Sequence, residues 1–219
     1  AQNAKRLAPS IGVYFSQNSH KSSISINVPT KGLKEIISIP NIQNSIKNCF
    51  EEIADIDEHC VRLITNYSKK FPNVLEGEVP QNSNGFESII NMCAKVLGIN
   101  SSKEFEDMAL NTSMTSGIQI DMKLVNLDGI NYLDYRRIVQ SIMAYKMADV
   151  DNITLVYSFF ESLSEFICNY VNEIATDLKA KDVVLCGNMF ANSILLSKTN
   201  KTLSKSYNII LPKEYPLDY

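Results

Sequence analysis

The sequence predicts an α/β protein built from two unequal lobes. Three short β-like runs open the chain, and the second half combines a long amphipathic helix with a strand–glycine–helix corner at Gly187. A stretch with Gly, Pro, Asn and Ser separates the halves at 75–84. We therefore expect a reduced N-terminal lobe over 1–74, a linker over 75–84, and a C-terminal lobe with a βαβ unit over 85–219.

The elements of the first half follow from apolar spacing. The runs 10–17, 22–28 and 34–39 are rich in β-forming residues and are separated by polar turns, which predicts an antiparallel meander. From 41 to 69 the apolar residues recur at helical spacing. This pattern predicts one long helix, which ends before Pro72.

The second half begins with short elements. We expect a buried helix over 88–97 that is capped by Gly98 in the left-handed conformation. The elements expected after it are a helix over 102–111 with Ser102 as its N-cap, a strand over 117–125, a turn over 126–129 and a helix over 132–146.

The clearest helix of the chain is expected over 152–179, where apolar residues form a wide stripe. A strand over 182–186, a helix over 189–204 and a strand over 208–211 follow it. We expect the two strands to form the centre of the C-terminal sheet, with the long helix packed behind them.

Composition excludes several classes of function. The net charge is −3 and no Lys/Arg stripe stands out, so we expect no nucleic-acid partner. No apolar run approaches membrane-spanning length, so we expect no membrane insertion. The five cysteines form no CxxC pair, and with two histidines a His-rich metal site is impossible. Buried free thiols in a reducing, cytoplasmic setting are the expected reading.

One stretch resembles a known family. VLCGNMFANSILL (184–196) resembles the VLSGGVFQNRLLL motif of the HypF carbamoyltransferases, which have a two-lobed, actin/Hsp70-like (ribonuclease H-like) ATPase fold. The matching positions are Leu185, Gly187, Phe190, Asn192, Leu195 and Leu196. Weaker resemblances follow in the same order along the chain, at 5–9, 35–44, 83–98, 105–107, 159–163 and 216–218. The chain is identified as a shortened, degenerate relative whose first lobe is truncated.

The resemblance implies a nucleotide site at four positions. Glu106 matches a sugar-contacting Glu of the family, Asn91 replaces its sugar-contacting Asp, and Gly187 and Asn188 stand at its phosphate corner. Asp218 matches a metal-binding Asp, but the family's metal-binding histidines and phosphate-binding hairpin have no counterpart here, so Asp218 is expected to be vestigial. Asn188 in place of a second glycine, and Glu87 in place of another, both disfavour phosphate.

Three functions follow as hypotheses. The first is a non-catalytic accessory or assembly protein for nickel–iron hydrogenase, with no catalytic residue, metal or cofactor, and with a hydrogenase subunit or maturation protein as partner. Loss of part of a lobe should uncover apolar surface, so a homo-oligomer, in the simplest case a homodimer, is expected. The alternative is residual nucleotide-dependent carbamoyl transfer through Glu106 and the Gly187 corner. The third is an interaction domain without any link to hydrogenase. In the first hypothesis Gly187 is a structural corner and holds no phosphate.

Overall fold

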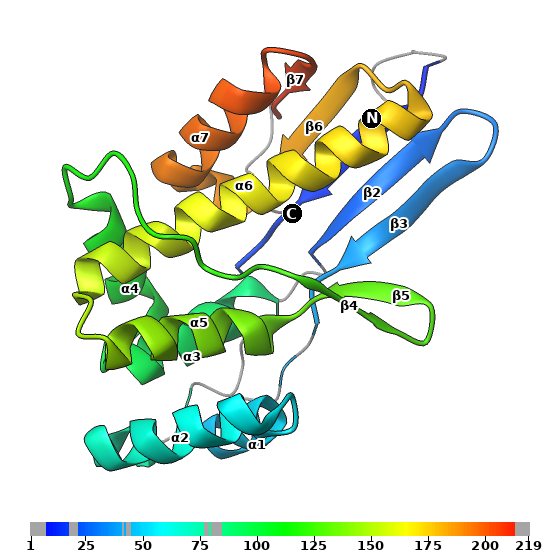
Figure 1. The fold of residues 1–219 in the computed structure, drawn as a ribbon. Helices are drawn as coiled ribbons and strands as arrows, with labels where there is room; N and C mark the ends of the chain where they lie inside the picture. The colour runs from blue at the N-terminus through cyan, green and yellow to red at the C-terminus, as the bar shows by residue number, and fades with distance from the viewer. Residues whose placement is uncertain are drawn as a thin grey trace.

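The fold is built around a seven-stranded mixed sheet in the order β4-β5-β3-β2-β1-β6-β7 (Figure 1). The computed structural model describes residues 8–17, 22–40, 42, 45–76, 79 and 85–212. The strands are β1 (Ser10–Tyr14), β2 (Ser23–Val28), β3 (Gly32–Ser38), β4 (Leu124–Leu127), β5 (Ile130–Leu133), β6 (Asp182–Cys186) and β7 (Asn208–Ile210). The first three strands form the predicted antiparallel meander, and β1 also pairs in parallel with β6.

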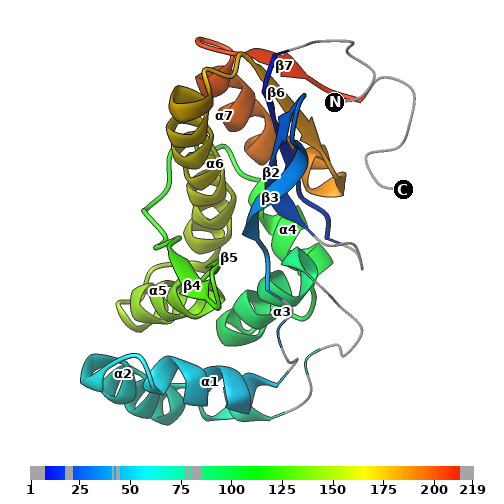
Figure 2. The ribbon, with the colours of Figure 1, turned by 90° about the vertical axis from the view of Figure 1, so that its right-hand side faces the viewer.

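Helices pack against one face of this sheet and beyond its lower end. They are α1 (Ile46–Ala54), α2 (Glu58–Lys70), α3 (Phe86–Leu97), α4 (Ser102–Leu110), α5 (Tyr135–Met147), α6 (Asn152–Leu178) and α7 (Ser193–Leu203), with short 3₁₀ helices η2 (Pro72–Leu75) and η3 (Asn188–Ala191). Figure 2 shows α6 and α7 in one layer beside the sheet, while α1 and α2 lie at the far end of the molecule. None of the described helices is both long and apolar enough to cross a bilayer.

The core forms where the apolar face of β1 meets α6. Ile11 and Val13 of β1, and Phe15 just past it, alternate along the chain and are fully buried. The register places Ile11 opposite Val183 and Val13 opposite Leu185, so β1 and β6 present one continuous apolar face. The stripe predicted for 152–179 supplies the opposite side, and this helix is confirmed as α6.

The sheet crosses the predicted boundary at 75–84. Strands β1–β3 come from 1–74, whereas β4–β7 come from 85–219, and all seven hydrogen-bond into one sheet. The α/β class is confirmed, while the division into two lobes stays a prediction. The expectation that 182–186 and 208–211 form the centre of the sheet is wrong for the second strand, because β7 is an edge strand.

Capping side chains correct three predicted helices. The helix expected over 41–69 is two helices, because Asp57 accepts a hydrogen bond from Cys60 N at 2.9 Å and starts α2 anew. The N-cap of α4 is Ser101 rather than Ser102. The helix expected over 189–204 is divided into η3 and α7 at Asn192, whose side chain caps α7.

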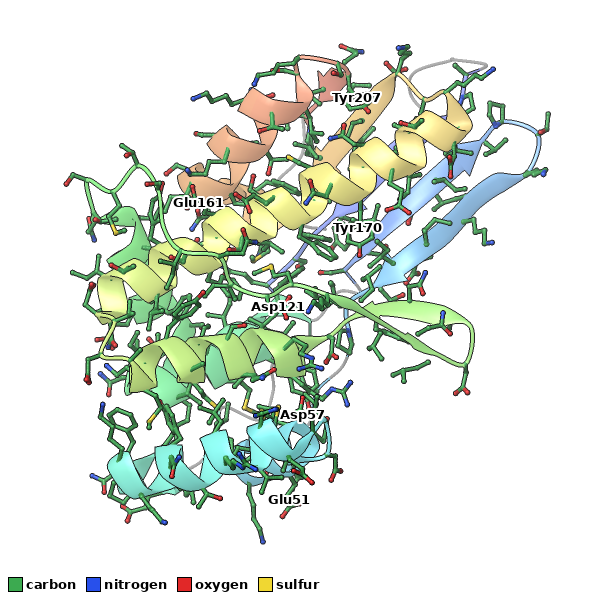
Figure 3. The ribbon with its side chains drawn as sticks, in the orientation of Figure 1. Glu51, Asp57, Asp121, Glu161, Tyr170 and Tyr207 are labelled. Carbon is green, nitrogen blue, oxygen red and sulfur yellow. The ribbon has the colours of Figure 1, made fainter. Side chains whose placement is uncertain are left out.

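The segment 117–125 is mostly not a strand. Only its last residues join β4, and the backbone before them bonds to side chains of α6. Ile118 N and Ile120 N donate to the hydroxyls of Ser158 and Ser162, each at 2.9 Å. Gly117 N donates to Glu161, which Figure 3 shows on α6 beside this segment. These backbone amides therefore find their hydrogen-bond acceptors on the surface of α6 instead of on a neighbouring strand.

The predicted left-handed cap at Gly98 and the predicted turn at 126–129 are both present in the structure. Gly98 ends α3 with φ +72°, as expected for a left-handed cap. The predicted turn at 126–129 joins β4 and β5, with positive φ at both Asp128 and Gly129. The helix expected over 132–146 begins later, at Tyr135, because β5 occupies the residues up to Leu133.

Candidate functional site

The candidate site lies where β1 and β6 end. The two strands are parallel, so their carboxyl ends meet at the same edge of the sheet. Phe15 N, just past β1, donates to Cys186 O at 3.0 Å and extends the pairing to the last residue of β6. In α/β sheets this edge is the usual place for a ligand.

Gly187 turns the chain directly against the backbone of β1. Its φ is +99°, and a β-carbon at this position would lie 2.0 Å from Phe15 O. Met189 N donates to the same carbonyl oxygen at 3.1 Å. The glycine therefore permits backbone to approach backbone at a positive φ.

Several backbone amides after this corner donate hydrogen bonds within the chain. Phe190 N donates to Gly187 O at 3.1 Å, and Asn192 N donates to Met189 O at 3.2 Å. The first amides of α7, those of Ile194 and Leu195, donate to Asn192 Oδ1. These are the groups that would otherwise hold an anion at a helix N-terminus.

Glu106 is the carboxylate of the site, and two amide side chains hold it. Gln17 Nε2 donates to Glu106 Oε2 and Asn192 Nδ2 donates to Glu106 Oε1, both at 2.9 Å. Gln17 N also donates to Asn188 Oδ1 at 2.6 Å. The structure thus brings together the predicted residues Glu106, Gly187 and Asn188. Sequence reasoning missed Gln17, although its place just beyond a strand was a usable signal.

Asn91 holds two helices together. Its side chain is buried within α3, and its Oδ1 accepts a hydrogen bond from Ser102 N at 3.2 Å. This bond joins α3 to the first turn of α4. The remaining predicted position, Asp218, lies outside the described residues.

Three aromatic rings fill the space beside the strand ends. The Phe15 ring lies 4.6 Å from that of Phe86 and 6.2 Å from that of Phe190, and all three are at most 1% exposed. Phe86 is the first residue of α3. Burial raises the pKa of the neighbouring Glu87 carboxyl, since the charged form loses solvation.

The described residues also include side chains of the kinds that could bind a metal ion or act as a nucleophile. Among these described residues, no group of three or more His, Cys, Asp or Glu side chains is arranged to hold a metal ion. Cys186, at the end of β6, is half-buried with its Sγ 3.6 Å from Val13 O. His59 is exposed on α2, and His20 lies outside the described residues.

The cysteines should differ in their reaction with a thiol reagent. Cys49, Cys60, Cys93 and Cys168 are buried, as predicted. Burial raises the pKa of Cys49 to about 12 and holds that of Cys93 well above its usual value, so few of these thiols ionise near pH 8. We expect one fast thiol in the native protein and five after denaturation. Cys186→Ser should remove the fast one; a fast phase that survives this substitution would contradict the assignment.

Comparison with known proteins identifies the family. A family model described as the second subdomain of the Kae1-like domain of carbamoyltransferases matches residues 81–218. The chain therefore belongs to this family, and the resemblance seen in the sequence is confirmed.

Individual relatives agree with this assignment. Protein HydE of Wolinella succinogenes is 25% identical over 184 residues, which is 78% of this chain and 33% of that protein. A full-length HypF solved in a phosphate- and nucleotide-bound form superposes with a TM-score of 0.69 at 14% identity, covering 99% of this chain and 32% of that one. HypF from T. kodakarensis gives 0.65 at 12% identity, with 96% and 32% covered. The two structures show a shared fold, and this chain spans about a third of the length of each relative.

Proposed function

We propose that this chain is a non-catalytic accessory or assembly protein in the maturation of nickel–iron hydrogenase. Membership of the HypF-related family supports a role in that system. The sequence also resembles the hydrogenase accessory proteins called HydE in epsilonproteobacteria, and the match to a protein of that name supports this reading. The observation that carries the non-catalytic part is the closed corner at Gly187.

Phosphate binding at this corner would have to break existing bonds. The amides of Met189 and Phe190 would leave their carbonyl partners. A net hydrogen bond is worth about 1 kcal/mol, and leaving a buried acceptor unsatisfied costs roughly 1–3 kcal/mol more. Glu106, if ionised, adds a like charge nearby. Together these costs are enough to weaken a micromolar affinity to about the millimolar range.

The alternative function is residual nucleotide-dependent carbamoyl transfer. Glu106 favours it, because the side chain that matches the family's sugar-contacting Glu does lie at the carboxyl ends of two parallel strands. Its carboxylate is held in place by Gln17 and Asn192, so it is ready to accept a hydrogen bond from a sugar hydroxyl. In this alternative the two lobes of an actin-like ATPase enclose the nucleotide.

Calorimetry separates the two functions. The full chain is titrated with ATP, with AMP-PNP and with carbamoyl phosphate. The accessory function predicts no heat of binding at about 1 mM ligand, whereas the alternative predicts a micromolar Kd. Glu106→Gln is the matched variant, since it removes the charge and keeps the shape. It should weaken any binding under the alternative and change nothing under the accessory function.

A cellular experiment tests the link to hydrogenase. Deleting the gene in a hydrogenase-producing host should lower hydrogenase activity, and a plasmid copy should restore it. The Glu106→Gln copy should restore it equally well if the role is non-catalytic. Unchanged hydrogenase activity after deletion would favour an interaction domain outside this system. A tagged chain should co-purify a hydrogenase subunit or maturation protein from the cytoplasm.

Self-association is part of the proposal. Leu127 and Ile130 face each other across the β4–β5 hairpin at the sheet edge and are 53% and 47% exposed. A second copy that covers this apolar pair would stabilise a homodimer. Sedimentation at about micromolar concentration should show a dimer, which Leu127→Ser should weaken. A strict monomer would contradict this part.

A further inference from the structure

A cavity of about 570 Å³ lies away from the strand ends, among the carboxyl-terminal ends of three helices. Its walls come from the last residues of α2, α3 and α5, and from η2. In Figures 1 and 2 these helices lie in the lower part of the molecule. The volume falls within the range of ligand pockets, and nothing in the proposed function uses it.

The lining of this cavity is positively charged in a chain whose net charge is −3. Lys70, Lys95 and Lys146 line it, and no Asp or Glu is among the lining residues. Two acidic side chains contact lining residues and offset part of this charge. Asp149 lies 2.6 Å from Lys70 Nζ, and Glu104 accepts from Asn100 Nδ2 at 2.8 Å. Because Asp149 pairs with Lys70, the positive charge available to an anion comes from Lys95 and Lys146.

The three lysines donate hydrogen bonds to residues outside their own helices instead of capping those helices. Lys70, at the end of α2, donates to Met147 O of α5 at 3.2 Å. Lys146 donates to Asn152 Oδ1 of α6 at 2.6 Å, and Lys95 donates to the backbone carbonyl of Glu76. A favourable interaction with helix dipoles explains why lysines occur at these ends. The helix dipoles alone do not explain why the ammonium groups of three helices gather around the same cavity.

An aromatic ring completes the lining. Phe71 is half-buried, with the ammonium groups of Lys70 and Lys146 at 5.6 and 6.0 Å from its ring centroid. The buried side chains of Val74, Val96, Leu97 and Ile99 add apolar surface. The cavity thus combines an apolar floor with a small number of cationic groups, which is the usual composition of a site for an organic ion.

We propose that this cavity binds a small organic polyanion. Its anionic groups contact the ammonium groups of Lys95 and Lys146, and its carbon skeleton packs on Phe71. A phosphate ester and a polycarboxylate share this chemistry, and the experiment below distinguishes them. The site is separate from the Gly187 corner and does not depend on the function proposed above.

Calorimetry of the full chain at low salt tests the proposal with three probes: phenyl phosphate, citrate and, as a neutral control, phenol. We expect phenyl phosphate or citrate to bind with a Kd below about 1 mM, and binding should weaken as salt is added. Binding of phenyl phosphate alone identifies a phosphate-ester site, and binding of citrate alone a polycarboxylate site. The proposal is overturned if neither anion gives a heat of binding at about 10 mM, or if phenol binds as tightly as the anions.

Matched variants locate the binding. Lys95→Gln with Lys146→Gln should weaken it at least about tenfold, because two cationic contacts are lost. Lys201→Gln with Lys205→Gln, at one exposed position in the last turn of α7 and one just past its end, makes the same change in net charge and should leave the affinity unchanged. Equal loss in both double variants overturns the site. If the first variant fails to fold, amide NMR shifts of the wild-type protein serve instead. Shifts at Gly98 and Asn100 support the cavity, and shifts confined to other regions overturn it.

Discussion

Gly187→Ala should destabilise the protein by more than about 4 kcal/mol and leave most of it insoluble. The added β-carbon would lie 2.0 Å from Phe15 O, 2.5 Å from its carbonyl carbon and 2.8 Å from its nitrogen. All three atoms belong to backbone that continues β1, so no side-chain rotation relieves the overlap. A φ of +99° with ψ of 149° is also close to a region that essentially only glycine adopts.

Gly98→Ala provides the control for this prediction. Gly98 also has a positive φ, +72°, but an added β-carbon would meet nothing within 4 Å. Its substitution should cost only about 1–2 kcal/mol, the price of the left-handed conformation for a residue with a side chain. Urea unfolding of both variants measures the difference. Equal losses of stability would show that the contact with Phe15 is not what makes Gly187 necessary.

Local features of this fold were predictable because their determinants are local. The stripe of α6 and the glycine that ends α3 each lie within one stretch of sequence. The break between α1 and α2 was missed for a related reason. Apolar spacing continues through 53–60, whereas the interruption depends on one Asp57 side chain that competes for the amide of Cys60.

Contacts between distant segments could not be predicted from the same patterns. Whether the segment around Ile118 becomes a strand depends on hydroxyls of α6 some 40 residues away. The pairing of β1 with β6 joins segments from opposite sides of the predicted linker, so a local change in composition gave no sign of the shared sheet.

The candidate site shows the same limit. Glu106 and Asn188 were indicated only by resemblance to the family, since nothing around either residue distinguishes it in the sequence. Gln17, which bonds to both, is 89 residues from the first and 171 from the second. The strand–glycine–helix pattern indicated the corner, the resemblance added Glu106 and Asn188, and only the fold reveals how the corner is closed.

The second large effect is expected at Phe86, the first residue of α3. Phe86→Ala should lower the free energy of unfolding by about 3–5 kcal/mol, because it removes a fully buried ring and leaves a cavity beside Phe15. Phe105→Ala is the matched control. Phe105 is equally buried, and its ring packs on Phe159 of α6 at 5.5 Å. Chemical denaturation of both variants should give losses of similar size.

The two variants also test what closes the site. Phe86→Ala opens space next to the Gly187 corner. If the ring alone excluded a nucleotide, this variant would bind ATP and Phe105→Ala would not. We expect neither to bind, because the amides of Met189 and Phe190 keep their backbone partners and Glu87 remains beside the opened space. Calorimetry with ATP on folded protein measures this directly. A micromolar Kd for Phe86→Ala alone would show that one side chain, and not the closed corner, keeps the site empty.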